Sequence, residues 1–117
     1  MDGSVVTLLK RDSLFAGLED RYLQEVAQRV RRRKFPAHEA IFHEEDEGAT
    51  LYILVSGHVH IQQTLPSGET VHIATRGPGE HFGELSLLDG KPRMADAITA
   101  EPCDLLLLSR TEFIRCV

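Results

Sequence analysis

The sequence predicts a mainly β fold, an antiparallel barrel or jelly roll with flanking helices at both ends. Short segments of alternating or continuous apolar residues follow one another closely between residues 41 and 108. Gly and Pro separate these segments, as is typical of antiparallel sandwiches and barrels. Helical spacing of apolar residues is confined to the first part of the chain and its very end.

Length and composition set broad limits on the function. A chain of 117 residues fits a single domain. The net charge of −5 argues against a dedicated nucleic-acid-binding protein, whose binding surface is usually basic. No apolar run approaches the roughly 20 residues of a membrane span, and the N-terminus has no secretory signal pattern. We therefore expect a location in the cytoplasm, or at the cytoplasmic face of a membrane protein.

The first third of the chain predicts a leader and an amphipathic helix. Residues 1–11 are expected to be a frayed leader, so that the domain covers residues 12–117. An apolar residue then recurs every fourth position, which predicts one buried helix face: Leu18, Tyr22, Val26 and Val30. The basic residues 31–34 are expected to close the last turn of this helix before Pro36 stops it. We expect this basic end to be solvated and to face the acidic stretch 39–47, with a nucleic-acid or lipid patch as the alternative.

The middle of the chain predicts strands. The expected strand segments are residues 41–42, 51–55, 59–63, 71–73, 95–101 and 104–108. Residues 105–108 are all leucine, so the last strand is expected to be buried on both faces. Ser109 and Glu112 then fit the two ends of a capping box, which predicts a helix that starts at Ser109. The chain stops before this helix completes three turns, so we expect a piece of a longer protein or an unusually short helix.

Several single residues allow two interpretations. Cys103 and Cys116 are expected to be reduced thiols in or near the core, with a disulfide or redox role as the alternative. The histidines of the paired strands are expected at exposed positions, and the alternative is a metal site like the H-x-H of cupins: His58, His60 and His72. Phe42 and Tyr52 are expected in the core, and His81 is expected to have a loop role.

Residues 79–97 carry the clearest chemical pattern. Gly83 allows the backbone to approach a ligand closely, and Glu84 begins a predicted short helix whose free N–H groups would face an anion. Arg93 follows nine residues later and could bind a phosphate, while Glu84 could accept from a sugar hydroxyl. The alternative is a surface ion pair between Glu84 and Arg93, worth about 0–1 kcal/mol. We find no nucleophile–base pair and no metal ligands at this site, so we do not expect an enzyme.

These motifs together resemble the cyclic nucleotide-binding domain of catabolite-activator-type regulators, cyclic-nucleotide-dependent kinases and cyclic-nucleotide-gated channels. The matching strings run from residue 14 to residue 113: LFxGL, PxxExIF, DxG, LYxL, SGxV, GPG and FGELSLL followed by PRxA. The last string resembles the phosphate-binding cassette of that family. The resemblance implies a β jelly roll (double-stranded β-helix) with N-terminal helices, a short phosphate-binding helix and the start of a C-terminal hinge helix.

The resemblance also implies roles for individual residues. Glu84 would hold the ribose 2′-hydroxyl and Arg93 the cyclic phosphate, and Gly83 would allow the backbone to come close to the ligand. Backbone amides would complete the anion cradle around Leu85, Ser86, Met94 and Ala95. Met94 lies where cGMP-selective members often carry Thr, so cAMP is expected rather than cGMP.

Three further positions depart from the family pattern. His38 and Glu45 stand where the family often has Gly, so we expect reshaped or slightly strained loops there, remote in sequence from the cassette. Asp96 adds a negative charge that would weaken anion binding if its side chain pointed inward. The pattern of strand alternation leaves its direction open.

The expected function is a regulatory module that binds a cyclic nucleotide and moves its C-terminal helix. An effector domain outside this chain would respond, and it could be DNA-binding, a channel or an enzyme. This chain itself would make no direct nucleic-acid contact, and a homodimer is possible. The alternative is a degenerate domain of the same fold that acts in interaction or dimerisation without binding a nucleotide.

Overall fold

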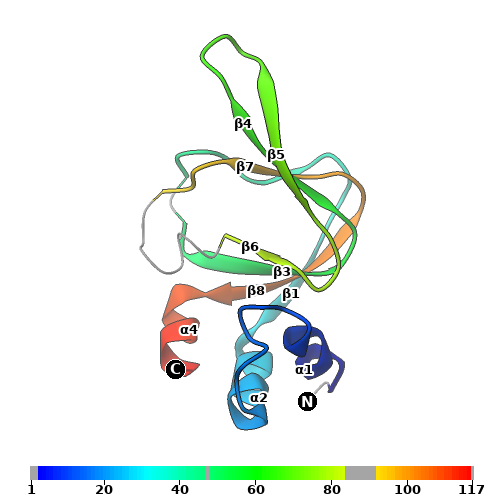
Figure 1. Ribbon diagram of the computed structural model, residues 1–117, viewed down its shortest axis with the longest axis vertical. Helices are drawn as coiled ribbons and strands as arrows, with labels where there is room; N and C mark the ends of the chain where they lie inside the picture. The colour runs from blue at the N-terminus through cyan, green and yellow to red at the C-terminus, as the bar shows by residue number, and fades with distance from the viewer. Residues whose placement is uncertain (1–2, 47, 84–91, 117) are drawn as a thin grey trace.

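Two antiparallel sheets and a group of helices make up the fold in the computed structural model, which describes residues 3–46, 48–83 and 92–116 (Figure 1). One sheet has the strand order β1 (Arg31–Phe35), β8 (Cys103–Ser109), β3 (Thr50–Ser56) and β6 (His81–Phe82). The other has the order β2 (Ala40–Phe42), β7 (Asp96–Thr99), β4 (Val59–Thr64) and β5 (Thr70–Arg76). The helices are α1 (Gly3–Lys10), α2 (Asp20–Arg29) and α4 (Arg110–Cys116).

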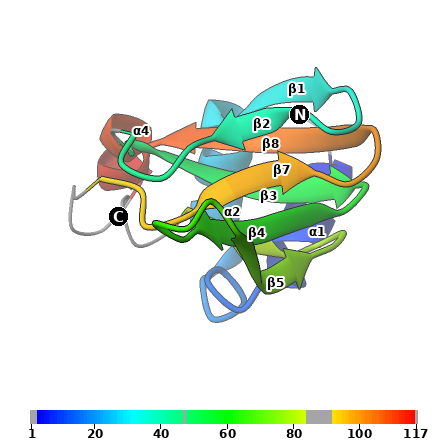
Figure 2. The same cartoon turned by 90° about the horizontal axis from the view of Figure 1, so that it is seen from above.

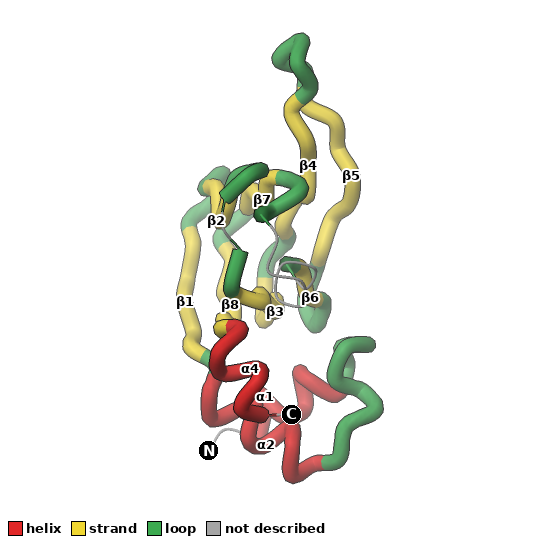
Figure 3. The backbone as a smooth tube through the Cα atoms, turned by 90° about the vertical axis from the view of Figure 1, so that its left-hand side faces the viewer, coloured by secondary structure: helices red, strands yellow, loops and turns green. Residues whose placement is uncertain are grey.

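The helices gather at one end of the molecule and the strands at the other (Figure 3). The hairpin of β4 and β5 extends beyond the rest of the strands at the far end (Figures 1 and 3). Seen from above, the strands lie in front of α1 and α2 (Figure 2). No helix in the described part of the chain is long and apolar enough to cross a membrane. The predicted mainly β, jelly-roll architecture is confirmed.

The two central strands of the first sheet, β3 and β8, are buried on both faces. Leu51 and Ile53 of β3 belong to a core under the helices, together with Phe15, Leu23 and Val26. Leu54, from the opposite face of the same strand, belongs to a second core between the sheets. The leucines of β8 divide in the same way, with Leu106 and Leu108 in the first core and Leu105 in the second. The prediction that this strand is buried on both faces is confirmed.

The beginning of the chain differs from the expected frayed leader. Residues 3–10 form helix α1, and Leu9 is fully buried in the core under the helices. Helix α1 therefore adds an apolar side chain to the same core that α2 covers, and this burial stabilises a helix too short to be stable alone.

The basic residues 31–34 do not end a helix. Helix α2 ends at Arg29, and Val30 already has an extended backbone with φ −73° and ψ 148°. Residues 31–35 form β1 and pair along their whole length with residues 103–107 of β8. Arg32 forms an ion pair with Asp104 (Nη2···Oδ2 2.7 Å) rather than facing the acidic stretch 39–47. Pairing with a buried central strand outweighs helix propensity here, and exposed charges suit an edge strand.

Candidate functional site

Arg93 is the central residue of the candidate site. It lies just before β7, and its backbone pairs with the loop that follows β2. The Arg93 N–H donates to the Asp46 carbonyl at 2.7 Å, and the Glu45 N–H donates to the Arg93 carbonyl at 2.8 Å. Only 4% of the Arg93 surface is exposed. This loop therefore fixes the backbone from which a buried guanidinium projects.

The guanidinium of Arg93 is held by two carbonyl oxygens and an aromatic ring. Nη1 donates to the Gly83 carbonyl at 3.0 Å, and Nη2 donates to the Thr50 carbonyl at 2.6 Å. Cζ lies 4.3 Å from the ring centroid of Phe42 and 5.7 Å from that of Tyr52. A cation at this distance from a ring face is attracted by the ring quadrupole, and the attraction grows when water is excluded. The surroundings thus orient a positive charge inside the protein.

Three aromatic rings form a cluster, and two of them contact the Arg93 guanidinium. Tyr52 and Phe82 stack at 5.2 Å between centroids, and Phe42 is tilted against them at 5.8 and 6.0 Å. Burial raises the pKa of Tyr52, an effect that the positive charge of Arg93 opposes. The prediction that Phe42 and Tyr52 belong to the core is confirmed, since both pack against the core between the sheets. Their contact with Arg93 was not predicted. Alternation along β3 does place the Tyr52 side chain on the face of the strand opposite to that of Leu51.

Gly83 lies where a side chain would be both crowded and strained. Its φ of +86° is in the left-handed region that favours glycine. A Cβ atom at this position would lie 2.6 Å from Nη1 of Arg93 and 3.1 Å from the Thr50 carbonyl oxygen. The absence of a side chain therefore allows the Arg93 guanidinium to reach the backbone, whereas the predicted close approach of a ligand to Gly83 stays a prediction.

The remaining predicted site residues divide into two groups. Glu84, Leu85 and Ser86 lie outside the described residues, and so does the predicted short helix. Met94 is 67% exposed and Ala95 is half-buried. The side-chain amide of Gln63 donates to the Met94 carbonyl at 2.8 Å, which connects the β4–β5 hairpin to the residue after Arg93.

The departures from the family pattern have clear structural outcomes. His38 and Glu45 have positive φ angles of 61° and 74°, so the predicted local strain is confirmed. Glu45 is remote from Arg93 in sequence but contacts it through the backbone hydrogen bond described above. Asp96 is turned toward the loop after β2, because its Oδ1 accepts the Glu44 N–H at 2.7 Å.

The histidines do not form a single cluster. The rings of His60 and His72 meet edge to face at 5.2 Å, whereas His58 pairs with Glu101 (Nδ1···Oε1 2.7 Å). In the described residues, no three His, Cys, Asp or Glu side chains are grouped to hold a metal ion.

Cys103 is a buried free thiol whose pKa is raised, mainly by burial. His81 has a structural contact, since its Nδ1 lies 2.5 Å from Oδ1 of Asp12.

Helix α4 begins close to the residues that hold Arg93. Ser109 caps it as predicted, accepting the Glu112 N–H at 3.2 Å. Ser109 also pairs with Thr50 across the sheet, and the Arg110 N–H donates to the Ala49 carbonyl at 2.8 Å. Glu112 forms an ion pair with Arg29 of α2 (Oε2···Nη1 2.7 Å), which lowers the pKa of the Glu112 carboxyl.

Comparison with known proteins identifies the family. The cyclic nucleotide-binding domain model matches residues 32–117. The Cyclic AMP receptor protein of Thermus thermophilus is 36% identical over 109 residues, which cover 93% of this chain and 50% of that protein. The CRP-like cAMP-activated global transcriptional regulator of Mycobacterium tuberculosis is 34% identical over 79% of this chain and 41% of its own length.

A solved structure agrees with the sequence relatives. The regulatory domain of Toxoplasma gondii PKA, crystallised with cAMP, superposes with a TM-score of 0.93 at 32% identity, over 98% of this chain and 44% of that one. This chain thus spans about half the length of the relatives it matches. It belongs to the cyclic nucleotide-binding domain family, and its fold is that of a regulatory domain.

Proposed function

We propose that this domain binds cAMP and that occupancy changes the position of helix α4, which reports to an effector domain. The observation that carries the proposal is the buried guanidinium of Arg93, held between the Gly83 and Thr50 carbonyls and the Phe42 ring. Arginine binds phosphate oxygens with two parallel hydrogen bonds, so a guanidinium that the fold holds at this place suits a cyclic phosphate in both charge and geometry.

The proposed contacts of the nucleotide follow the arrangement of the cassette. Arg93 would bind the cyclic phosphate, and Glu84 would accept from the ribose 2′-hydroxyl. Gly83 would allow the ligand to reach the backbone, and N–H groups around four residues would complete the anion cradle: Leu85, Ser86, Met94 and Ala95. The carboxylate of Asp96 is already bonded to the Glu44 N–H, so it gives no reason to expect weaker phosphate binding.

Base selectivity is proposed to favour cAMP over cGMP. Met94 is 67% exposed beside Arg93 in sequence, so its side chain is available to a ligand. A thioether donates no hydrogen bond and is a weak acceptor, so it offers nothing to the guanine edge that adenine lacks. The relatives named for cAMP support this choice.

Helix α4 is suitably placed to respond to the ligand. The Thr50 carbonyl accepts from Arg93, and Thr50 pairs with Ser109 at the start of α4. A phosphate that drew Arg93 away from Thr50 would change the hydrogen bonding of β3 at the residue that pairs with Ser109, where β8 leads into this helix. A ligand shifts such an equilibrium only by its difference in affinity for the two states. The effector would lie in the full-length protein, in the cytoplasm, and could be DNA-binding, a channel or an enzyme.

A ligand panel tests the proposal. The chain is titrated with cAMP, cGMP and a cyclic dinucleotide while its thermal unfolding and binding heat are measured. Ligand at 100 times its Kd should add about 2.7 kcal/mol to the free energy of unfolding. Stabilisation by cAMP at lower concentration than by cGMP supports the proposal. No stabilisation by any of the three favours the degenerate interaction domain, for which the strained Glu45 next to Arg93 is the structural argument.

A further inference from the structure

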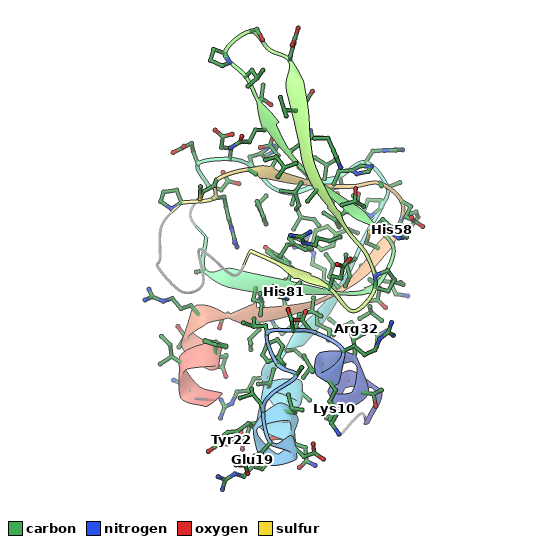
Figure 4. The ribbon with its side chains drawn as sticks, in the orientation of Figure 1. Lys10, Glu19, Tyr22, Arg32, His58 and His81 are labelled. Atoms are coloured by element: carbon green, nitrogen blue, oxygen red, sulfur yellow. The ribbon has the colours of Figure 1, made fainter. Side chains whose placement is uncertain are left out.

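A second polar cavity lies where the helices meet the strands. It has a volume of about 510 Å³ and is lined by residues 11–13, Arg76 and residues 79–81. Figure 4 shows His81 at this junction, between the strands and the helical end. Arg93 does not line the cavity, and neither do the described residues that hold its guanidinium. Among the described residues, the cavity and the surroundings of the Arg93 guanidinium therefore have no residue in common.

The two acidic residues of the lining are engaged in hydrogen bonds within the protein. The Asp12 side chain is fully buried, and its Oδ1 accepts the Leu14 N–H at 2.8 Å and lies 2.5 Å from Nδ1 of His81. Glu80 accepts the Gly77 N–H at 2.7 Å through Oε1. Both carboxylates keep their charge, but they are held by the turns on either side of the cavity and by His81, and neither forms an ion pair with Arg11 or Arg76.

Neither of the two arginines of the lining has an ion pair with a described residue. Within residues 3–46, 48–83 and 92–116, no carboxylate lies within 4.0 Å of the guanidinium of Arg11 or of Arg76. Arg11 lies along Gly79, where an added Cβ would be 3.6 Å from Nε and 3.7 Å from Cζ. Asp12 and Glu80 also line the cavity, but the N–H donors of the two guanidinium groups are not taken up by ion pairs with them, so these donors are available to an anion. This arrangement occurs in a chain whose net charge is −5.

We infer that this cavity binds a small anion that carries a phosphate or pyrophosphate group. Two guanidinium groups match the oxygens of such an anion, and the Ser13 hydroxyl in the lining is a further donor. The volume lies in the range of roughly 300–1,000 Å³ that is usual for small-molecule sites. An anion here would connect the turn after α1 with the segment between β5 and β6.

Calorimetric titration of the chain tests the inference. Sodium pyrophosphate, inorganic phosphate and glycerol 3-phosphate are titrated in turn at constant ionic strength, which distinguishes a free anion from a phosphomonoester. The variants Arg11→Gln and Arg76→Gln keep side-chain length and polarity but remove one charge each. Arg21→Gln is the matched control, because Arg21 is an exposed arginine of α2 that lies outside the cavity and near Glu19. Unfolding temperatures without ligand establish that each variant is folded.

The expected result is saturable binding of at least one of these anions by the wild-type chain and by Arg21→Gln. Affinity should fall by about tenfold or more in both Arg11→Gln and Arg76→Gln, since each removes a forked, charged contact. Absence of saturable binding to the wild-type chain, or equal affinity in all variants, overturns the inference. A parallel cAMP titration keeps the two sites distinct, because the Arg11 and Arg76 variants should bind cAMP as the wild-type chain does.

Discussion

Arg93 donates a hydrogen bond of 2.6 Å to the carbonyl of Thr50, and Thr50 is the strand partner of Ser109, the N-cap of helix α4. The same guanidinium donates to the carbonyl of Gly83, which lies near the start of the predicted cassette. One side chain therefore connects the segment expected to bind phosphate with the strand end that precedes the C-terminal helix.

Replacing Arg93 should abolish most of the proposed cAMP binding. Arg93→Ala is expected to cost about 2–5 kcal/mol of binding free energy, because a buried phosphate loses its charged partner. Arg93→Lys keeps the charge but loses the fork geometry, so its affinity should lie between those of Arg93→Ala and the wild-type chain. Calorimetry with cAMP measures all three.

Folding must be controlled in this series, because Arg93→Ala leaves the Gly83 and Thr50 carbonyls without the donor seen here. Circular dichroism and the unfolding temperature of each variant provide that control. Equal cAMP affinity in the wild-type chain and in a folded Arg93→Lys or Arg93→Ala variant would show that Arg93 does not bind the phosphate.

Removing the strain at Glu45 should stabilise the protein. A left-handed backbone costs a residue other than glycine about 1–2 kcal/mol, and glycine loses about 0.5–1 kcal/mol more on folding than alanine does. Glu45→Gly, at φ 74°, should therefore raise the free energy of unfolding by up to about 1 kcal/mol. His38→Gly, at φ 61°, should gain less, since histidine tolerates this region better.

The neighbouring Glu44 is the matched control for Glu45, because it is not among the described residues with positive φ. Glu44→Gly should lower the stability by about 0.5–1 kcal/mol, in the opposite direction. Urea unfolding of the three variants gives the comparison. If Glu45→Gly were destabilised as much as Glu44→Gly, the backbone of Glu45 would not be a source of strain.

The ion pair between Arg29 and Glu112 should make the attachment of α4 depend on pH. The pKa of Glu112 is lowered in the folded state, mainly by its hydrogen bond with Arg29. Its contribution to stability is therefore present above the ordinary carboxyl pKa of 4.5 and is lost as pH falls through the lower folded pKa. The melting temperature of Glu112→Gln should be lower than that of the wild-type chain at pH 7. This gap in melting temperature should close as the pH falls.

Thermal unfolding from pH 7 down to pH 3 measures this gap. Glu69→Gln is the control, since Glu69 is an exposed residue of the β4–β5 turn. Its melting temperature should follow that of the wild-type chain across the series. A gap for Glu112→Gln that stays constant with pH would contradict the role of the ion pair.

The sequence predicts the strands well because successive side chains of a strand point to opposite faces, so the pattern of apolar residues reports which faces are buried. Leu51 and Ile53 face one core and Leu54 the other, and the leucines of β8 divide in the same way. The cap at Ser109 was also predictable, because it depends on residues only three apart. The strained loops were predictable where His38 and Glu45 replace the glycines that a left-handed backbone favours.

The errors concern features that depend on distant partners. Residues 31–34 have no apolar pattern of their own, and only pairing with β8 makes them a strand. Residues 3–10 form a helix because Leu9 finds a core made by other segments. At the site, the role of Thr50 lies in its backbone carbonyl, for which a side-chain pattern gives no signal. Glu84, Leu85 and Ser86 lie outside the described residues, so their proposed roles stay predictions.

Gly83→Ala tests whether the close approach of Arg93 matters. Its Cβ would lie 2.6 Å from Nη1 of Arg93, so the guanidinium would have to move, and φ +86° adds backbone strain. The substitution should lower the free energy of unfolding by about 1–3 kcal/mol and weaken cAMP binding.

Two other glycines separate these effects. Gly68, at φ +90°, has no atom within 4 Å of an added Cβ, so Gly68→Ala measures backbone strain alone. Gly17 has open space and no positive φ, so Gly17→Ala should be neutral or slightly stabilising. The effect of the contact with Arg93 is then the difference between Gly83→Ala and Gly68→Ala in the free energy of unfolding, measured with urea, and in cAMP affinity, measured by calorimetry. Because Gly83 contacts the guanidinium and Gly68 does not, Gly68→Ala should keep its cAMP affinity even though it loses stability. A Gly83→Ala variant with wild-type cAMP affinity would place the phosphate away from this carbonyl.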